Sequence, residues 1–164
     1  NTGGMMVDAN ETDPVRRARN FHGVWWGLSY DAALEQAKST GKPILIDFTG
    51  VNCANCRLME KSVMPRSEVV QRLEQFIPVQ LYTDRVPVDG LSADEKFNLA
   101  EQNLMLEVEL TNQQVSPLYV VLTADQQLVL PPRGGYIEPA EFVAYLDQAL
   151  AEYNNIAQAA EAGD

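Results

Sequence analysis

The sequence predicts an α/β fold in which a central mixed sheet carries helices on both faces. Three short apolar runs have the length and composition of buried strands, and stretches with helical spacing separate them. These runs are Ile44–Phe48, Ile77–Tyr82 and Leu118–Leu122. The chain has 164 residues, 46% of them hydrophobic, which is enough for one domain with a sizeable core.

Charge and hydropathy exclude two classes of partner. A formal net charge of −11 repels phosphate backbones, so no nucleic acid is expected to bind. No apolar run approaches the ~20 residues that a membrane-spanning helix needs, so we expect no membrane insertion of this segment. No signal peptide is recognisable, and the start at Asn1 rather than Met leads us to expect a mature chain or an excised domain.

The composition also suggests domain limits. Residues 1–20 are polar and lack periodicity, so we interpret them as a flexible tail or linker. Residues 21–154 form the predicted domain. Residues 155–164 are rich in alanine and acids, and we expect them to fray.

The first helix is expected from Ser29 to about Ser39. Ser29 is a suitable N-cap, and Gly41 can close the helix in the left-handed conformation. The strand Ile44–Phe48 follows Pro43.

A second helix is expected to begin at the cysteines and to end before Pro65, and a third begins at Ser67. The strand Ile77–Tyr82 comes next. Residues 92–95 then match a capping box, which predicts an inserted helix that ends near Leu106.

The last third of the chain predicts a hairpin and a helix. The strand Leu118–Leu122, a turn at residues 124–127 and a short strand, Leu128–Leu130, suggest an antiparallel hairpin. Pro139 fits the first turn of the final helix. The apolar residues of this helix form one stripe, Phe142, Leu146, Ala149, Leu150 and Tyr153.

Cys53 and Cys56 are the only cysteines. One close pair excludes a disulfide framework, and a zinc site would need more ligands than these thiols and the distant His22. At the start of a helix, unpaired N–H groups and a partial positive charge favour the thiolate, which is the attacking species in exchange. We therefore expect a redox-active Cys53–Cys56 disulfide and no other cofactor or metal, with Cys53 as nucleophile and Cys56 as resolving cysteine. The alternatives are a two-ligand metal site or an inert buried pair.

The pattern resembles the thioredoxin superfamily. The resemblance rests on the strand Ile44–Phe48, on the C-x-x-C motif that follows it, and on Ser116-Pro117 before an apolar strand. It covers about residues 25–153 and implies a thioredoxin-like fold, with the inserted helix placed before a cis-proline.

A narrower resemblance is to the C-terminal periplasmic domain of the thiol:disulfide interchange protein DsbD, a membrane reductant transporter. It is carried by Ala32–Lys38, by Gly41-Lys42-Pro43 before the strand, and by Met59-Glu60 after the second cysteine. This resemblance implies a periplasmic location and thiol–disulfide interchange of the kind used in cytochrome c biogenesis.

Asp47 lies six residues before Cys53, where thioredoxin-like proteins place a buried acid. A carboxyl group in an apolar strand should have a raised pKa, so it could relay a proton to or from Cys56. The alternative is a strand-end Asp that makes hydrogen bonds in a loop.

Ser116 and Pro117 match the cis-proline segment of the superfamily. The resemblance implies that Ser116 offers backbone groups to an incoming peptide and that Pro117 shields the cysteines from metal. An ordinary trans proline at the start of a strand is the alternative. The expected substrate-binding set is completed by Asn52, Ala54 and Asn55.

Several residues depart from thioredoxins. Asn52 replaces the usual Trp, and Ala54-Asn55 replaces Gly-Pro. Gln80 stands where a lysine is usual, so a charge partner for the buried acid is expected to be missing. Neither Pro nor His lies between the cysteines, which favours a reductant. Residues 85–114 form a longer connection than in thioredoxin, either a lid or partner surface or, as we favour, only a packed inserted helix.

The favoured function is a protein-disulfide reductase domain that passes electrons through Cys53 and Cys56 to disulfides in other proteins. Its expected partners are those proteins and a dithiol donor, which could be a membrane-embedded reductant transporter. We expect an extracytoplasmic location, with tethering through residues outside this chain. The alternatives are a copper or other soft-metal binding module and a redox-inert interaction domain with a thioredoxin fold.

Overall fold

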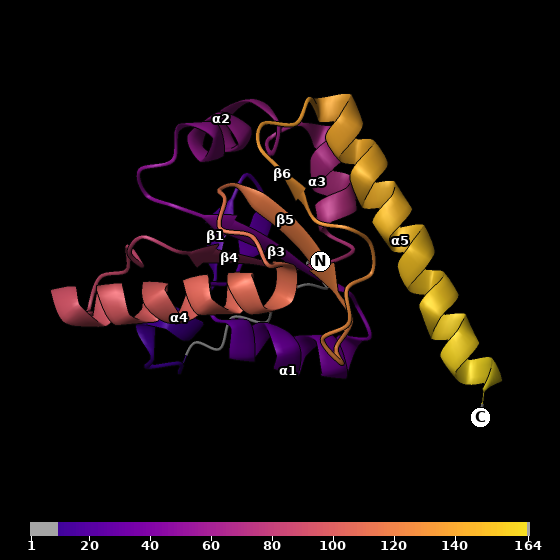
Figure 1. The fold of residues 1–164 in the computed structure, drawn as a ribbon, viewed down its shortest axis with the longest axis horizontal. Coiled ribbons are helices and arrows are strands. Elements are labelled where there is room, and N and C mark those ends of the chain that lie inside the picture. Colours follow the sequence, from indigo (N-terminus) through magenta and orange to yellow (C-terminus); the bar gives the residue numbers. More distant parts are fainter. Residues whose placement is uncertain (1–9, 164) are drawn as a thin grey trace.

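A four-stranded mixed sheet lies at the centre of the structure, a computed structural model that describes residues 10–163 (Figure 1). The strand order is β4-β3-β5-β6. Strand β3 pairs in parallel with β4 and antiparallel with β5, and β6 pairs antiparallel with β5. The strands are β3 (Ile44–Thr49), β4 (Ile77–Tyr82), β5 (Leu118–Leu122) and β6 (Arg133–Gly134). The predicted α/β class and mixed sheet are confirmed.

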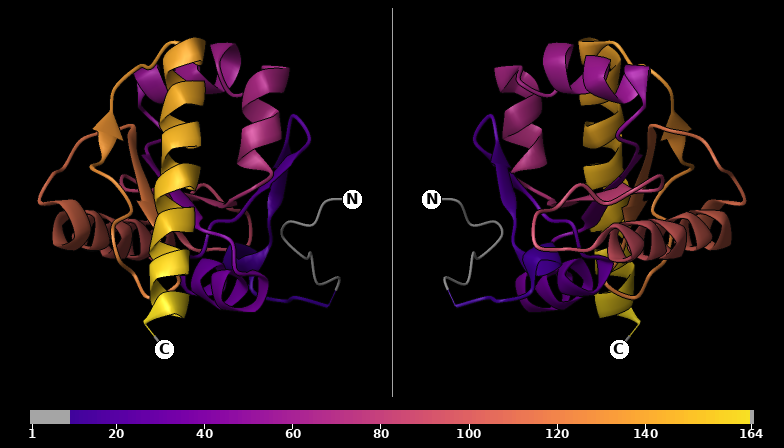
Figure 2. Two further views of the ribbon diagram at one scale, coloured as in Figure 1. Left: turned by 90° about the vertical axis from the view of Figure 1, so that its right-hand side faces the viewer. Right: turned by 90° about the vertical axis from the view of Figure 1, so that its left-hand side faces the viewer.

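Helices cover both faces of this sheet (Figures 1 and 2). One face packs against α1 and α4, and the other packs against α2, α3 and α5. The helices are α1 (Tyr30–Thr40), α2 (Ala54–Ser62), α3 (Ser67–Leu73), α4 (Ala93–Thr111) and α5 (Pro139–Ala162). Ser29 caps α1, and Ser92 and Glu95 form the predicted capping box of α4.

Side chains along β3 alternate between the two layers, as the pleat requires. Ile44, Ile46 and Phe48 belong to the core under α1 and α4, whereas Leu45 packs in the core with α2, α3 and α5. Asp47, two positions after Leu45, therefore faces the layer that contains α2.

Ordered structure begins inside the segment that was expected to be a tail up to residue 20. A short 3-10 helix, η1 (Pro14–Arg16), precedes the antiparallel pair β1 (Arg19–Phe21) and β2 (Val24–Trp26). The pair is fixed by Trp26, whose side chain is buried in the core beside α2, α3 and α5. Residues 1–9 of the expected tail lie outside the described residues.

Two predicted helix ends are wrong. Helix α4 continues past Leu106 to Thr111 and ends where Asn112 adopts the left-handed conformation. Helix α5 continues past Asn154 to Ala162, because alanines favour the helix and Ile156 still packs against the core. Only residue 164 of the expected frayed tail lies outside the described part of the chain.

The predicted strand Leu128–Leu130 is also wrong. Leu128 forms only an isolated bridge with Leu122, and the strand that pairs with β5 is Arg133–Gly134. Pro131 and Pro132 separate the two, and proline cannot donate a ladder hydrogen bond. No helix among residues 10–163 is long and apolar enough to cross a membrane.

Candidate active site

Cys53 and Cys56 form a disulfide at the N-terminus of α2. Cys53 is the N-cap residue, and its Sγ accepts a hydrogen bond from the backbone N–H of Cys56 at 3.2 Å. Cys56 is buried, whereas Cys53 is only partly buried. The outer sulfur is therefore accessible to a partner, and it lies at the N-terminus of a helix, where unpaired N–H groups and the helix dipole can stabilise a thiolate.

A hollow of about 400 Å³ opens beside Cys53. Four of the five residues expected to bind substrate line it, which are Asn52, Ala54, Asn55 and Ser116. The rest of its lining consists of Gly50, Thr83 and Asp84. The structure thus brings residues from before the cysteines, from α2 and from the segment before β5 into one place.

The peptide bond between Ser116 and Pro117 is cis, as the resemblance implies. The carbonyl oxygen of Pro117 accepts a hydrogen bond from the N–H of Gly135 at 3.0 Å. A Cβ atom on Gly134 would lie 3.2 Å from the same oxygen, a tight contact, so any side chain at this position would press β6 and this segment apart.

Asp47 is buried, with 1% of its surface exposed. Its Oδ2 accepts a hydrogen bond from Gln80 Nε2 at 3.2 Å, and its Oδ1 is buried without a partner. Burial raises the pKa of Asp47 to about 7, the Gln80 hydrogen bond opposes this rise, and the nearby charge of Glu60 adds to it. The carboxyl group can therefore gain or lose a proton near neutral pH.

Gln80 connects Asp47 to α2. Its Nε2 also donates a hydrogen bond to Oε2 of Glu60 at 3.3 Å. The same oxygen forms an ion pair with Nη2 of Arg57 at 2.9 Å. Arg57 in turn donates to Thr49 Oγ1 at 3.3 Å, and its charge slightly lowers the pKa of Asp47. A lysine was expected to be missing at position 80, and the positive charge near Asp47 is supplied instead by Arg57 of α2.

Sequence reasoning gave no role to Glu60 or Asp84. Glu60 lies four residues after Cys56, so helix periodicity alone places the two on one face of α2. Asp84 follows the end of β4, and the carboxyl ends of the parallel strands β3 and β4 meet at one edge of the sheet. Asp84 accepts hydrogen bonds from the N–H groups of Val51 at 2.9 Å and Asn52 at 3.0 Å.

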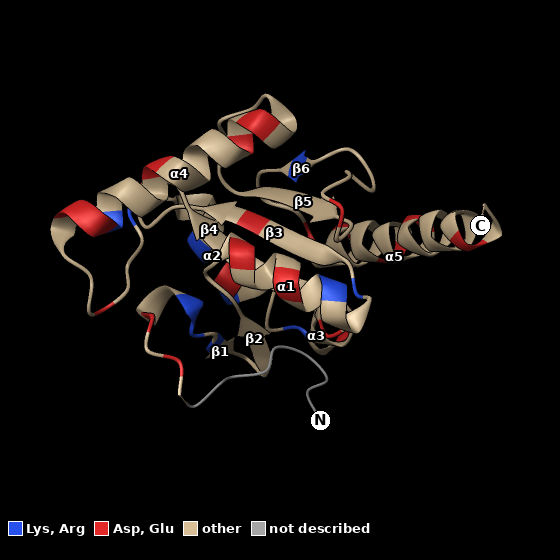
Figure 3. Cartoon of the chain, turned by 90° about the horizontal axis from the view of Figure 1, so that it is seen from below, with Lys and Arg blue, Asp and Glu red and all other residues tan. Residues whose placement is uncertain are grey.

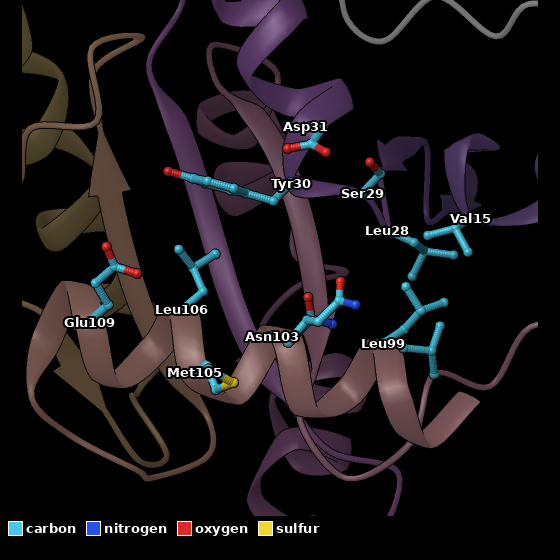
Figure 4. Close-up of a pocket in the computed structure, with 12 residues that line it drawn as sticks. Val15, Leu28, Ser29, Tyr30, Asp31, Leu99, Asn103, Met105, Leu106 and Glu109 are labelled. Atoms are coloured by element: carbon cyan, nitrogen blue, oxygen red, sulfur yellow. The ribbon is translucent and has the colours of Figure 1, made fainter. Parts of the chain in front are cut away.

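A second hollow, of about 360 Å³, lies between α4 and the start of α1 (Figure 4). Leu28, Leu99 and Leu106 line it together with Asp31 and Glu109. None of the expected site residues is part of its lining, so the hollow beside Cys53 is the candidate active site. Within residues 10–163, no three His, Cys, Asp or Glu side chains form a group that could hold a metal ion.

A helix-capping C-x-x-C disulfide beside a cis-proline, on a mixed sheet covered by helices, defines a protein of the thioredoxin class. Residues 30–150 match the thioredoxin-like domain family, and this match spans well over half of the chain. The chain belongs to this family of the thioredoxin superfamily, and it is similar to DsbD proteins.

One curated relative is the thiol:disulfide interchange protein DsbD 1 of Pseudomonas aeruginosa, which is 31% identical over 81 residues. The alignment covers 40% of this chain and 14% of DsbD 1, so the chain corresponds to a small part of that relative.

Solved structures share the fold. The C-terminal domain of Neisseria meningitidis DsbD in the reduced form has a TM-score of 0.53 at 22% identity, covering 74% of this chain and 98% of that domain. A DsbH oxidoreductase has a TM-score of 0.59 at 22% identity, covering 92% and 95% of the two chains. A thioredoxin from Thermus thermophilus has a TM-score of 0.59 at 20% identity, covering 79% and 90%.

Proposed function

We propose that this chain reduces disulfides in other proteins by thiol–disulfide exchange at Cys53 and Cys56. The observation that carries the proposal is the partly exposed Cys53 at the helix N-terminus, in one hollow with Ser116. Membership of the thioredoxin-like family and the likeness to DsbD support it.

The reaction starts from the reduced protein. The Cys53 thiolate attacks one sulfur of a substrate disulfide, which forms a mixed disulfide and releases the other substrate sulfur as a thiolate. The Cys56 thiolate then attacks Sγ of Cys53, so the Cys53–Cys56 disulfide forms and the substrate leaves as a dithiol. Two electrons pass from the protein to the substrate.

Asp47 serves the second step. Cys56 must lose a proton before it can attack, and a buried carboxylate with a pKa of about 7 can accept that proton near neutral pH. Asp47 faces the layer that contains α2, and its Oδ1 has no other partner to compete for the proton.

The likeness to DsbD suggests how the site is kept reduced. In this proposal a dithiol donor, such as a membrane-embedded reductant transporter, reduces the Cys53–Cys56 disulfide after each turnover. The domain then works outside the cytoplasm, in the periplasm, and serves thiol–disulfide interchange of the kind needed for cytochrome c biogenesis. Tethering to a membrane would use residues outside this chain.

A pair of single-cysteine variants tests the proposal. The reduced wild type should reduce the disulfides of a model protein such as insulin, with dithiothreitol as the electron source. Cys53→Ser should be inactive and form no adduct. Cys56→Ser should also fail to turn over. Incubated with the substrate after dithiothreitol is removed, the reduced Cys56→Ser protein should accumulate a mixed disulfide through Cys53, visible by mass spectrometry.

The two variants are matched, since each removes one sulfur from the same helix turn. Equal reduction by wild type and Cys53→Ser would contradict the proposal. An adduct that forms through Cys56 in Cys53→Ser as readily as through Cys53 in Cys56→Ser would contradict the assignment of roles.

A further inference from the structure

Asp84 holds the loop that leads into the nucleophile. Its Oδ1 accepts the N–H of Val51 at 2.9 Å, and its Oδ2 accepts the N–H of Asn52 at 3.0 Å. A Cβ atom on Gly50 would lie 3.1 Å from Oδ2, so the loop closes tightly around the carboxylate. Asn52 directly precedes Cys53 and lines the hollow beside it. Asp84 therefore fixes the side of the hollow that Asn52 forms, which we call its first wall.

Glu107 fixes the segment that leads to Ser116, which forms the second wall of the same hollow. This residue of α4 is buried, with 1% of its surface exposed, and its Oε2 accepts the N–H of Val115 at 3.3 Å. Its own carbonyl oxygen accepts the hydroxyl of Thr111 at 2.7 Å, which fixes the last turn of the helix. Val115 directly precedes Ser116 and the cis Pro117.

Both acids belong to the long connection between β4 and β5. Asp84 stands at its start, and Glu107 lies in the second half of α4. Asn103 of α4 donates to the carbonyl oxygen of Tyr82 at 2.9 Å, so the helix is anchored at the end of β4, two residues before Asp84. The connection is thus fixed to the sheet between its two carboxylates.

We propose that Asp84 and Glu107 are positioning residues that hold the two walls of the hollow beside Cys53, one at Asn52 and the other at Ser116, and that this hollow is the groove in which the substrate binds. The proposal rests on the proposed function, because these walls matter only if a peptide lies between them. It gives the inserted segment a task beyond packing: it sets the width of the groove in which the substrate disulfide meets Cys53.

The chemistry of both carboxyl groups fits this task. For Asp84, burial opposes ionisation, but the backbone N–H groups of Asn52, Val51 and Arg85 outweigh it, and the pKa is lowered. Asp84 therefore remains an ionised acceptor. For Glu107, burial raises the pKa to about 7, and the hydrogen bond from Val115 only partly offsets this. A buried carboxyl group is costly for stability, so its retention favours a role outside folding.

Glu107→Leu and Glu107→Gln separate positioning from folding. Leu removes the acceptor and also the cost of burying a carboxyl group, so this variant should be at least as stable as the wild type. Its kcat/KM for a protein disulfide should fall by about three- to tenfold, mostly through KM, as expected for one lost hydrogen bond. Gln keeps an acceptor oxygen and should restore KM. The alkylation rate of reduced Cys53 by iodoacetamide should stay unchanged in both variants.

Asp84→Ala should raise KM in the same way. The matched controls are Glu109→Gln, which alters an exposed acid on the same helix, and Asp89→Asn, which alters an exposed acid in the same connection. Both controls should behave as the wild type. An unchanged KM in Glu107→Leu and in Asp84→Ala would overturn the proposal.

Amide hydrogen exchange tests the walls independently of activity. Exchange of the Val115 amide should accelerate in Glu107→Leu, and exchange of the Val51 and Asn52 amides should accelerate in Asp84→Ala. Unchanged exchange would overturn the positioning role even in an active enzyme. A wild type without disulfide reductase activity would instead refute the proposed function. The exchange rates would still show whether Asp84 and Glu107 hold the backbone at Val51, Asn52 and Val115.

Discussion

Asp47 shows how a single residue connects the core of this domain to its chemistry. Its carboxyl group is buried, accepts one hydrogen bond from Gln80, and has a second oxygen without a partner. Tyr119, its neighbour on β5, has a buried hydroxyl that also lacks a partner. The protein keeps incompletely satisfied polar atoms beneath α2, and such atoms cost stability unless function requires them.

Replacing Asp47 by Asn should stabilise the oxidised protein at neutral and higher pH. The pKa of Asp47 is higher in the folded than in the unfolded chain, so wild-type stability falls as the pH rises from about 4 to about 7. At 1.36 kcal/mol per unit, the shift from 3.8 to about 7 corresponds to an upper bound of about 4 kcal/mol. Denaturant unfolding of both proteins from pH 3 to pH 9 measures the difference.

The advantage of Asp47→Asn should disappear below pH 4, where the acid is protonated in both states. Asp125→Asn, a change in an exposed turn, should give no such pH-dependent difference. The same Asp47→Asn variant should resolve the mixed disulfide more slowly. A stability difference independent of pH would contradict the assigned ionisation.

Not all residues of the site could be predicted from the sequence. Asp47 and the two cysteines lie along a single strand and the start of the next helix, so local pattern was enough to propose them as site residues. Asp84 and Glu107 act through hydrogen bonds to the backbone of distant segments, at Val51 and Val115. Such bonds depend on how elements meet, and no spacing in the sequence encodes them.

At the scale of elements, β6 is the least obvious part of the site. It contains only Arg133 and Gly134, and it lies against the beginning of β5, next to the cis Pro117. The close approach is possible because Gly134 has no side chain: an added Cβ would lie 3.3 Å from Leu118 Cδ1 and 3.2 Å from the Pro117 oxygen.

Gly134→Val should push β6 away from this segment. Overpacking of this kind costs about 1–3 kcal/mol, so the free energy of unfolding should fall by that amount. The shift of Pro117 should also raise KM for a protein disulfide. Urea unfolding and steady-state kinetics measure the two effects. The control is Arg133→Ala, which changes the other residue of β6 and removes its surface ion pair with Glu141 of α5. This variant should have little effect on stability or on KM. Effects as large as those of Gly134→Val would contradict the steric account.

The elements were predicted where propensity and tertiary packing agree. Capping signals at Ser29 and Ser92 correctly located the starts of α1 and α4. The strand expected at Leu128–Leu130 does not form, because its buried apolar residues pack against the core without continuing the hydrogen-bond ladder with β5. The β1–β2 pair was missed because strands of three residues carry too little alternation to be recognised.

The whole molecule carries its charge unevenly. Helix α5 has four acids and no basic residue, and α4 has five acids and one lysine (Figure 3). A surface of this sign repels phosphate groups. The site itself lies between α2, β5 and the connection that contains α4.

Redox direction is also a property of the whole domain, because the reduction potential measures how strongly the fold favours the dithiol or the disulfide. The central claim is that this domain donates electrons to protein disulfides. Its most direct test is the equilibrium of the Cys53–Cys56 pair with a thioredoxin or glutathione reference couple, read by thiol alkylation and mass spectrometry. We expect a potential near or below about −270 mV, typical of a reductant. A potential near about −120 mV, as in a strong oxidant, would contradict the claim.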